Sequence, residues 1–200
     1  MISMIILGAL GLMVILGLAK LVLKDFRLGA IATVIFLALV IGLNFIPTLN
    51  IGGFYFRVGT LIFCLGVIAM FFVYGRFVTQ MTALAIALIL GGLAYAGTRL
   101  AMLAGNSFFA DTNFAYALII GTLAFLFTRN GKYSFIVSAG AMLILNMLVQ
   151  IGMTTVTLDR GFDWLVVAAA TGVVMFAVAA RLAVKPSKMS YYFEAGRLED

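Results

Sequence analysis

The sequence carries little charge and no histidine. Only 10% of its 200 residues are Asp, Glu, Lys or Arg, and it has one cysteine, Cys64, and two prolines. Soluble domains carry about 25% charged residues. Without histidine, His-based acid–base catalysis and His metal ligation are excluded. A single cysteine cannot form a disulfide within the chain.

Carboxylates are missing from the long apolar runs. All seven lie in expected loops or near the C-terminus: Asp25, Asp111, Asp159, Asp163, Glu194, Glu199 and Asp200. No carboxyl pair lies within an apolar run, and neither a phosphate-binding loop nor a Gly-x-Ser-x-Gly motif is present. The sequence therefore predicts no enzymatic activity, no metal and no cofactor. The lack of buried carboxylates also disfavours a proton-driven pump of the usual kind.

What the sequence has in abundance is apolar surface. Hydrophobic residues make up 65% of the chain, and the mean hydropathy is +1.23. A soluble fold of this size has nowhere to place so much apolar surface, whereas a lipid bilayer accommodates it. Only helices and closed barrels satisfy their backbone in hydrocarbon, and barrel strands would show alternating hydropathy. We therefore expect an all-α, polytopic transmembrane helical bundle.

Seven apolar runs are long enough to cross a bilayer, which takes about 20 residues. They cover residues 2–23, 28–47, 57–75, 77–104, 113–129, 133–153 and 162–184. We expect one transmembrane domain over 1–185, followed by a short polar cytoplasmic tail over 186–200. Since no basic residue precedes the first run, we expect a retained helix rather than a cleaved signal peptide.

The basic residues predict the orientation. Ten of the 13 Lys and Arg residues fall on one side of the seven-span arrangement, and Arg57, Arg99 and Arg160 fall on the other. Because Lys and Arg accumulate in cytoplasmic loops, the N-terminus is expected outside and the C-terminus in the cytoplasm. This pattern fits the plasma membrane of a prokaryote. It also explains the positive net charge without a nucleic-acid partner.

The chain shows a weak internal match at an offset of 102 residues. This offset aligns Asn44 with Asn146 and Gly59 with Gly161. A true repeat would divide the protein into three helices, a linking helix and three further helices. Alternatively, recurring cytoplasmic arginines and loop glycines produce the match by chance. The seven-helix organisation resembles SWEET-type sugar transporters in helix count and orientation, but their Pro-Gln signature is absent and no residue role carries over.

Polar residues at the outer ends of the expected spans form a candidate ligand site. The six residues are Arg99, Asn44, Asn146, Gln150, Tyr95 and Arg57. A charge at mid-membrane costs about 2.5–3.5 kcal/mol, and a guanidinium suits a carboxylate or phosphate. The pattern predicts an outward-facing pocket in which Arg99 holds a small anionic or polar ligand. Alternatively, Arg99 reaches the outer interface or pairs with Asp111, and the amides only link helices.

The expected helix at 77–104 carries small residues at four-residue spacing. One set is Ala83, Ala87 and Gly91, and the other is Gly97, Ala101 and Gly105. Small residues let helix backbones approach closely in lipid. This face is therefore expected either to pack within the bundle or to contact another membrane subunit or a second copy of the chain.

Three functions remain open at this point. The first is a small transporter or a substrate-binding membrane subunit that uses the site around Arg99. The second is a structural or assembly subunit of a larger membrane complex. The third is a lipid-handling protein in which an outer arginine contacts lipid head groups. The position of the polar residues favours the first.

Overall fold

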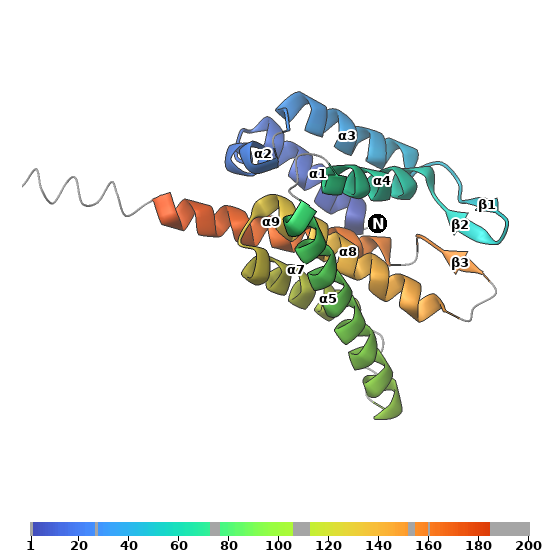
Figure 1. Ribbon diagram of the computed structural model, residues 1–200. Coiled ribbons are helices and arrows are strands. Elements are labelled where there is room, and N and C mark those ends of the chain that lie inside the picture. Colours follow the sequence, from blue (N-terminus) through green and yellow to red (C-terminus); the bar gives the residue numbers. More distant parts are fainter. Residues whose placement is uncertain are drawn as a thin grey trace, which may run out of the picture.

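The computed structural model describes residues 2–26, 28–72, 77–105, 113–151, 155–159 and 161–184. Its helices are α1 (Ile2–Ile15), α2 (Lys20–Phe26), α3 (Ala30–Leu43), α4 (Val58–Phe72), α5 (Phe77–Leu103), α7 (Asn113–Thr128), α8 (Gly131–Gln150) and α9 (Phe162–Val184). Three short strands accompany them: β1 (Leu49–Ile51), β2 (Phe54–Phe56) and β3 (Val156–Thr157). The helical fold class is confirmed, and the strands are an addition that the sequence did not predict (Figure 1).

The helix lengths support a membrane protein but not yet a span count. Within the described residues, α5, α8 and α9 are long and apolar enough to cross a membrane. The apolar helices α1, α3, α4 and α7 have only 14 to 16 residues. At 1.5 Å per residue such helices reach about 21–24 Å, whereas the hydrocarbon core is about 30 Å thick. Seven spans, and the orientation of the termini, therefore remain predictions.

The expectation of one continuous first helix over 2–23 is wrong. Helix α1 ends at Ile15, and α2 begins at Lys20 after a turn. Gly17 occupies the left-handed region, with φ of 72°, which glycine adopts at little cost. The N–H groups of Leu18 and Ala19 donate to the carbonyl of Met13 and close the helix end. Because the apolar composition continues through this turn, hydropathy does not reveal it.

The expected turn between the second and third spans is a β-hairpin. β1 and β2 pair antiparallel, and Gly52 and Gly53 form the turn with φ values of 60° and 90°. β2 then pairs parallel with β3, in the register Phe54↔Val156 and Tyr55↔Thr157. The two strands that pair belong to segments far apart in the sequence, and they form a small sheet at one end of the molecule (Figure 1).

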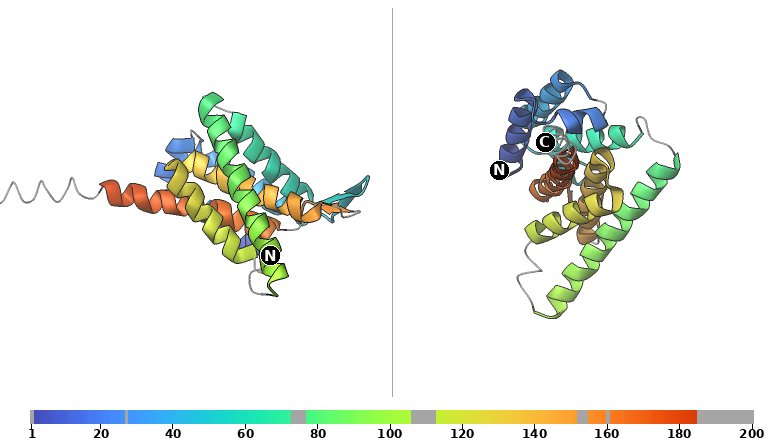
Figure 2. Two further views of the ribbon diagram at one scale, coloured as in Figure 1. Left: turned by 60° about the horizontal axis from the view of Figure 1, so that its bottom comes forward. Right: turned by 90° about the vertical axis from the view of Figure 1, so that its left-hand side faces the viewer.

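The helices form two groups of similar order. In the first half (α1–α4), α3 packs on α1 and α4, and in the second half (α7–α9) all three helices pack on one another. α5 links the halves in sequence and lies along α8 (Figure 2). The first half is held against the second mainly through α9 and α8, which contact α1, α2 and α4. Strand β2 lies in the connection between α3 and α4, and β3 lies in the connection between α8 and α9. These two connections occupy corresponding places in the two halves.

Contacts in the structure reproduce the sequence offset of 102 residues. The β2–β3 register pairs residues at this separation, and so does the contact between Arg57 and Asp159. In each half, a glycine also lies close to an asparagine that precedes it by 15 residues. A Cβ on Gly59 would lie 2.5 Å from the Asn44 amide nitrogen, and one on Gly161 would lie 3.6 Å from Asn146. A parallel register gives all of the pairs across the sheet the same separation, so the duplication of the two halves stays a prediction.

Helix α8 packs against the small-residue face of α5. Ala83, Ala87 and Gly91 are buried. A Cβ built on Gly91 would lie 2.7 Å from the carbonyl oxygen of Ala141, so the two backbones are in direct contact. This set of small residues therefore serves packing within the chain. Gly105, from the second set, is exposed.

We predict that Gly91→Ala destabilises the protein and that its neighbour Gly92→Ala does not. Gly91 has no room for a methyl group, whereas nothing lies within 4 Å of a Cβ on Gly92. Overpacking costs about 1–3 kcal/mol, and the helix propensity gained at either position is at most about 1 kcal/mol. Unfolding in detergent, followed by circular dichroism, compares the two. Equal stability of both variants would contradict the close α5–α8 contact.

Candidate functional site

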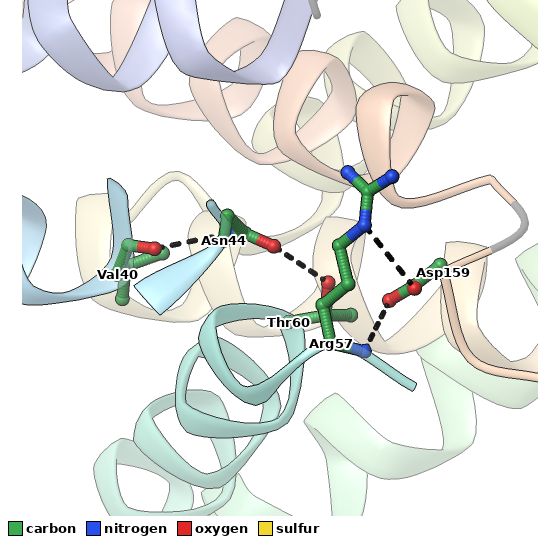
Figure 3. A network of polar contacts seen from close by, with 5 residues as sticks. All are labelled: Val40, Asn44, Arg57, Thr60 and Asp159. Atoms are coloured by element: carbon green, nitrogen blue, oxygen red, sulfur yellow. Dashed lines mark hydrogen bonds and ion pairs between the residues drawn. The ribbon is translucent and has the colours of Figure 1, made fainter. Parts of the chain in front are cut away.

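Asn44 joins the ends of α3 and α4. Its side-chain oxygen accepts a hydrogen bond of 3.2 Å from the Thr60 hydroxyl, and its amide nitrogen donates to the Val40 carbonyl at 3.1 Å (Figure 3). Asn44 is only 4% exposed. Gly59 lies directly against this bond, which explains why no larger side chain fits there. Asn44 thus links two helices of the first half.

Gln150 pairs with β3 much as a neighbouring strand would. Its side-chain oxygen accepts from the Thr157 N–H at 2.6 Å, and its nitrogen donates to the Thr157 carbonyl at 3.0 Å. The same nitrogen donates to the side-chain oxygen of Asn146 at 3.0 Å. Gln150 is 3% exposed. The predicted pair Asn146 and Gln150 does share a face, and together they fix β3 to the end of α8.

Arg57 connects the halves through Asp159. The Arg57 backbone N–H donates to Asp159 Oδ1 at 2.9 Å, and its Nε lies 3.7 Å from Oδ2 (Figure 3). Beside this contact, the Leu158 N–H donates to the Tyr55 carbonyl at 2.8 Å. Sequence reasoning identified Asp159 only as a loop carboxylate. The offset of 102 residues, which aligns it with Arg57, was the signal that could have found it.

We call Arg57, Asp159, Gln150 and Thr157 the sheet-end clip. These residues hold β2, β3 and the C-terminal end of α8 together. A further bond ties the same end, because the buried Ser3 donates its backbone N–H to Asp163 Oδ1 at 3.0 Å. The Arg57 backbone N–H, the Gln150 amide and the Thr157 backbone are bonded within the protein. The geometry of the clip therefore indicates a structural connection between segments rather than an open pocket.

Arg99 and Tyr95 lie apart from the clip. They occupy the C-terminal part of α5, whose end projects away from the strands in Figure 1. Arg99 Nε donates to the Tyr95 hydroxyl at 3.0 Å, and the guanidinium carbon lies 5.3 Å from the Tyr95 ring centroid. The six-residue site expected from the sequence is thus divided into two groups. Asp111, the alternative partner of Arg99, lies outside the described residues.

A cavity lies between the halves at the opposite end from the clip. Its volume is about 210 Å³, and it is partly open to the surface. Leu10, Leu37 and Phe63 contribute walls from the first half, and Phe135 and Val166 contribute walls from the second. Among the described residues that line the cavity, Arg181 is the one with a charged side chain. In Figure 1, α2 and the C-terminal end of α9, which bound this cavity, lie at the end of the bundle remote from the sheet.

No protein family, curated protein or solved structure matches the chain. Within the described residues, no group of His, Cys, Asp and Glu is placed to hold a metal ion. The clip, the Arg99–Tyr95 pair and the apolar cavity are the features of the described residues that bear on function.

We predict that Asp159→Ala destabilises the protein more than Arg57→Ala. Removing Asp159 takes the charged acceptor from the Arg57 backbone N–H, an exposed bond that contributes about 1 kcal/mol, and removes the ion pair as well. Removing the Arg57 side chain loses only an ion pair that is 49% exposed on the arginine side, which contributes less than about 1 kcal/mol. Denaturation in detergent measures both. Asp159→Asn, which keeps an oxygen acceptor, should fall between them, and the reverse order would contradict the role of the backbone bond.

Proposed function

We propose that this chain is a small transporter, or the substrate-binding membrane subunit of one. In this proposal it resides in a plasma membrane with seven spans, its N-terminus outside and its C-terminus in the cytoplasm. One observation carries the proposal. The two halves are joined at one end by the sheet-end clip, and an apolar cavity lies between them at the other end, where α2 also contacts α8 and α9. Transporters are commonly built from internal repeats that rock against each other around a site between them.

The clip is weak enough to open in such a movement. The parallel contact of β2 and β3 covers two residue pairs, and the Arg57–Asp159 ion pair is partly exposed. Exposed ion pairs contribute about 0–1 kcal/mol. By contrast, the buried contacts of α8 with α7 and α9 lie within the second half and need not change. The proposed movement breaks the clip and the bond between Ser3 and Asp163, and it requires α1, α2 and α4 to shift against α8 and α9.

Arg99 is the proposed contact for an anionic group on the outer side. Its side chain is exposed, and the Tyr95 hydroxyl holds Nε, which leaves the terminal nitrogens directed away from that bond. A guanidinium fixed in this way can donate two parallel hydrogen bonds to a carboxylate or phosphate. Asn44, Asn146, Gln150 and Arg57 support the proposal as parts of the moving framework rather than as ligand donors.

Distances between spin labels test the movement. In a Cys64→Ala background, labels at Phe54→Cys and Thr155→Cys report the separation of the two halves at the clip, and labels at Asn50→Cys and Phe54→Cys report the hairpin alone. We predict a short and a longer distance for the first pair, with the longer one enriched by Asp159→Ala, and one distance for the control pair. A single short distance for the first pair, unchanged by Asp159→Ala, would contradict the transporter.

An assembly subunit is a second candidate, favoured by the exposed end of α5. Leu93, Leu100 and Leu103 are 64%, 66% and 84% exposed, on a segment that projects from the bundle. A helix of another subunit, or of a second copy, would cover these residues. If the protein acts in assembly, a partner at fixed ratio should copurify from its own host and be lost in Leu100→Gln. Purification as a lone monomer from that host would contradict this candidate.

A further inference from the structure

The apolar cavity lies beside the part of the first half that departs from the second. At the offset of 102 residues, the turn at 16–19 corresponds to 118–121, which lie inside the unbroken helix α7. There α7 lies directly on α9, since a Cβ on Gly121 would stand 2.5 Å from the Ala168 carbonyl oxygen. In the first half the chain turns at Gly17 instead, and α2 leaves the line of α1. The cavity occupies the space between α1, α2 and α9.

The walls of this cavity are hydrocarbon-like. Apart from Thr33 and Arg181, its lining residues are aliphatic, aromatic or methionine side chains. The volume of about 210 Å³ exceeds the ~150 Å³ of an engineered apolar cavity that stays dry and takes up benzene. Water gains too few hydrogen bonds in such a space, and an empty space loses the dispersion contacts of its walls. An apolar chain is therefore the occupant that these walls suit.

Two cations converge at the turn that borders the cavity. Arg181 Nη2 donates to the Leu18 carbonyl at 3.2 Å, and Leu18 itself lines the cavity. The Lys20 ammonium lies 3.8 Å from the position of a Cβ on Gly17, so it reaches back over the same turn. Arg181 uses one of its five N–H donors in this bond. A guanidinium can donate two parallel hydrogen bonds to the oxygens of a phosphate. The cavity therefore combines an apolar interior with a positively charged edge.

We propose that the cavity binds an anionic phospholipid, with one acyl chain between α1, α2 and α9 and the phosphate on Arg181 and Lys20. The site is separate from Arg99 and lies at the opposite end from the clip. It requires that this end of the bundle face a membrane surface, where anionic lipids meet basic residues. It does not require that the protein transports anything. The bound lipid fills a cavity that would otherwise destabilise the contact between the halves.

Native mass spectrometry of the full-length protein tests the site. The protein is exchanged into mild detergent with equal amounts of phosphatidylglycerol and phosphatidylcholine. The site predicts one phosphatidylglycerol retained per chain, preferred about tenfold over phosphatidylcholine, because phosphatidylglycerol is net anionic whereas the choline ammonium offsets the phosphate charge and opposes Arg181 and Lys20. Arg181→Gln should abolish that preference. Arg129→Gln, which removes an equal charge from a residue that does not line the cavity, should leave it unchanged.

A second pair of variants tests the acyl-chain part of the site. Ala170 and Ala177 line the cavity, so Ala170→Leu/Ala177→Leu should fill it and lose the retained lipid. Ala85→Leu/Ala96→Leu adds the same atoms on the exposed face of α5 and should retain the lipid. Size-exclusion profiles and circular dichroism confirm that all variants fold. The proposal is overturned by equal retention of both lipids in the wild type, by equal losses in Arg181→Gln and Arg129→Gln, or by lipid retained in the filled variant.

Discussion

The parallel pairing of β2 with β3 joins the two halves of this protein at one end. It joins the connection between α3 and α4 to the connection between α8 and α9, and Arg57 and Asp159 extend it by one further contact. Residues that are equivalent at the offset of 102 touch each other here. If the halves are a duplicated pair, the axis that relates them passes near this sheet, because equivalent residues meet only near such an axis.

Away from the sheet, the halves differ, and the difference has physical consequences. The second half packs three long or unbroken helices around glycines such as Gly121 and Gly172, which allow direct backbone contact. In the first half, two shorter helices, α1 and α2, stand where the second half has the single helix α7, and a turn at Gly17 joins them. The close contact of α7 with α9 has no counterpart of similar extent between α1 or α2 and α4, and an apolar cavity with a basic edge lies between α1, α2 and α9. The asymmetry supplies a candidate binding site that a symmetric bundle would lack.

Apolar composition was enough to predict the helices, because continuous hydropathy is visible in a single sequence. The expected helix at 162–184 coincides with α9, and the one at 77–104 ends within one residue of α5. The turn at Gly17 escaped prediction, since its neighbours are as apolar as the helix they interrupt. For the site, the sequence placed Asn146 and Gln150 on one face, but it could not show that Gln150 pairs with the β3 backbone or that Arg99 lies elsewhere. Partners such as Thr157 and Asp159 are set by three-dimensional contacts between distant segments.

Disulfide cross-linking across the sheet tests the arrangement of the halves most directly. In a Cys64→Ala background, Tyr55→Cys/Thr157→Cys places the two thiols at positions paired in register. Tyr55→Cys/Thr155→Cys shifts one of them by two residues and serves as the control. Mild oxidation in membranes should cross-link the first pair rapidly and the second slowly or not at all, because a disulfide needs Cα atoms within about 7 Å. Equal cross-linking of both pairs, or none in the first, would contradict the pairing of the two halves.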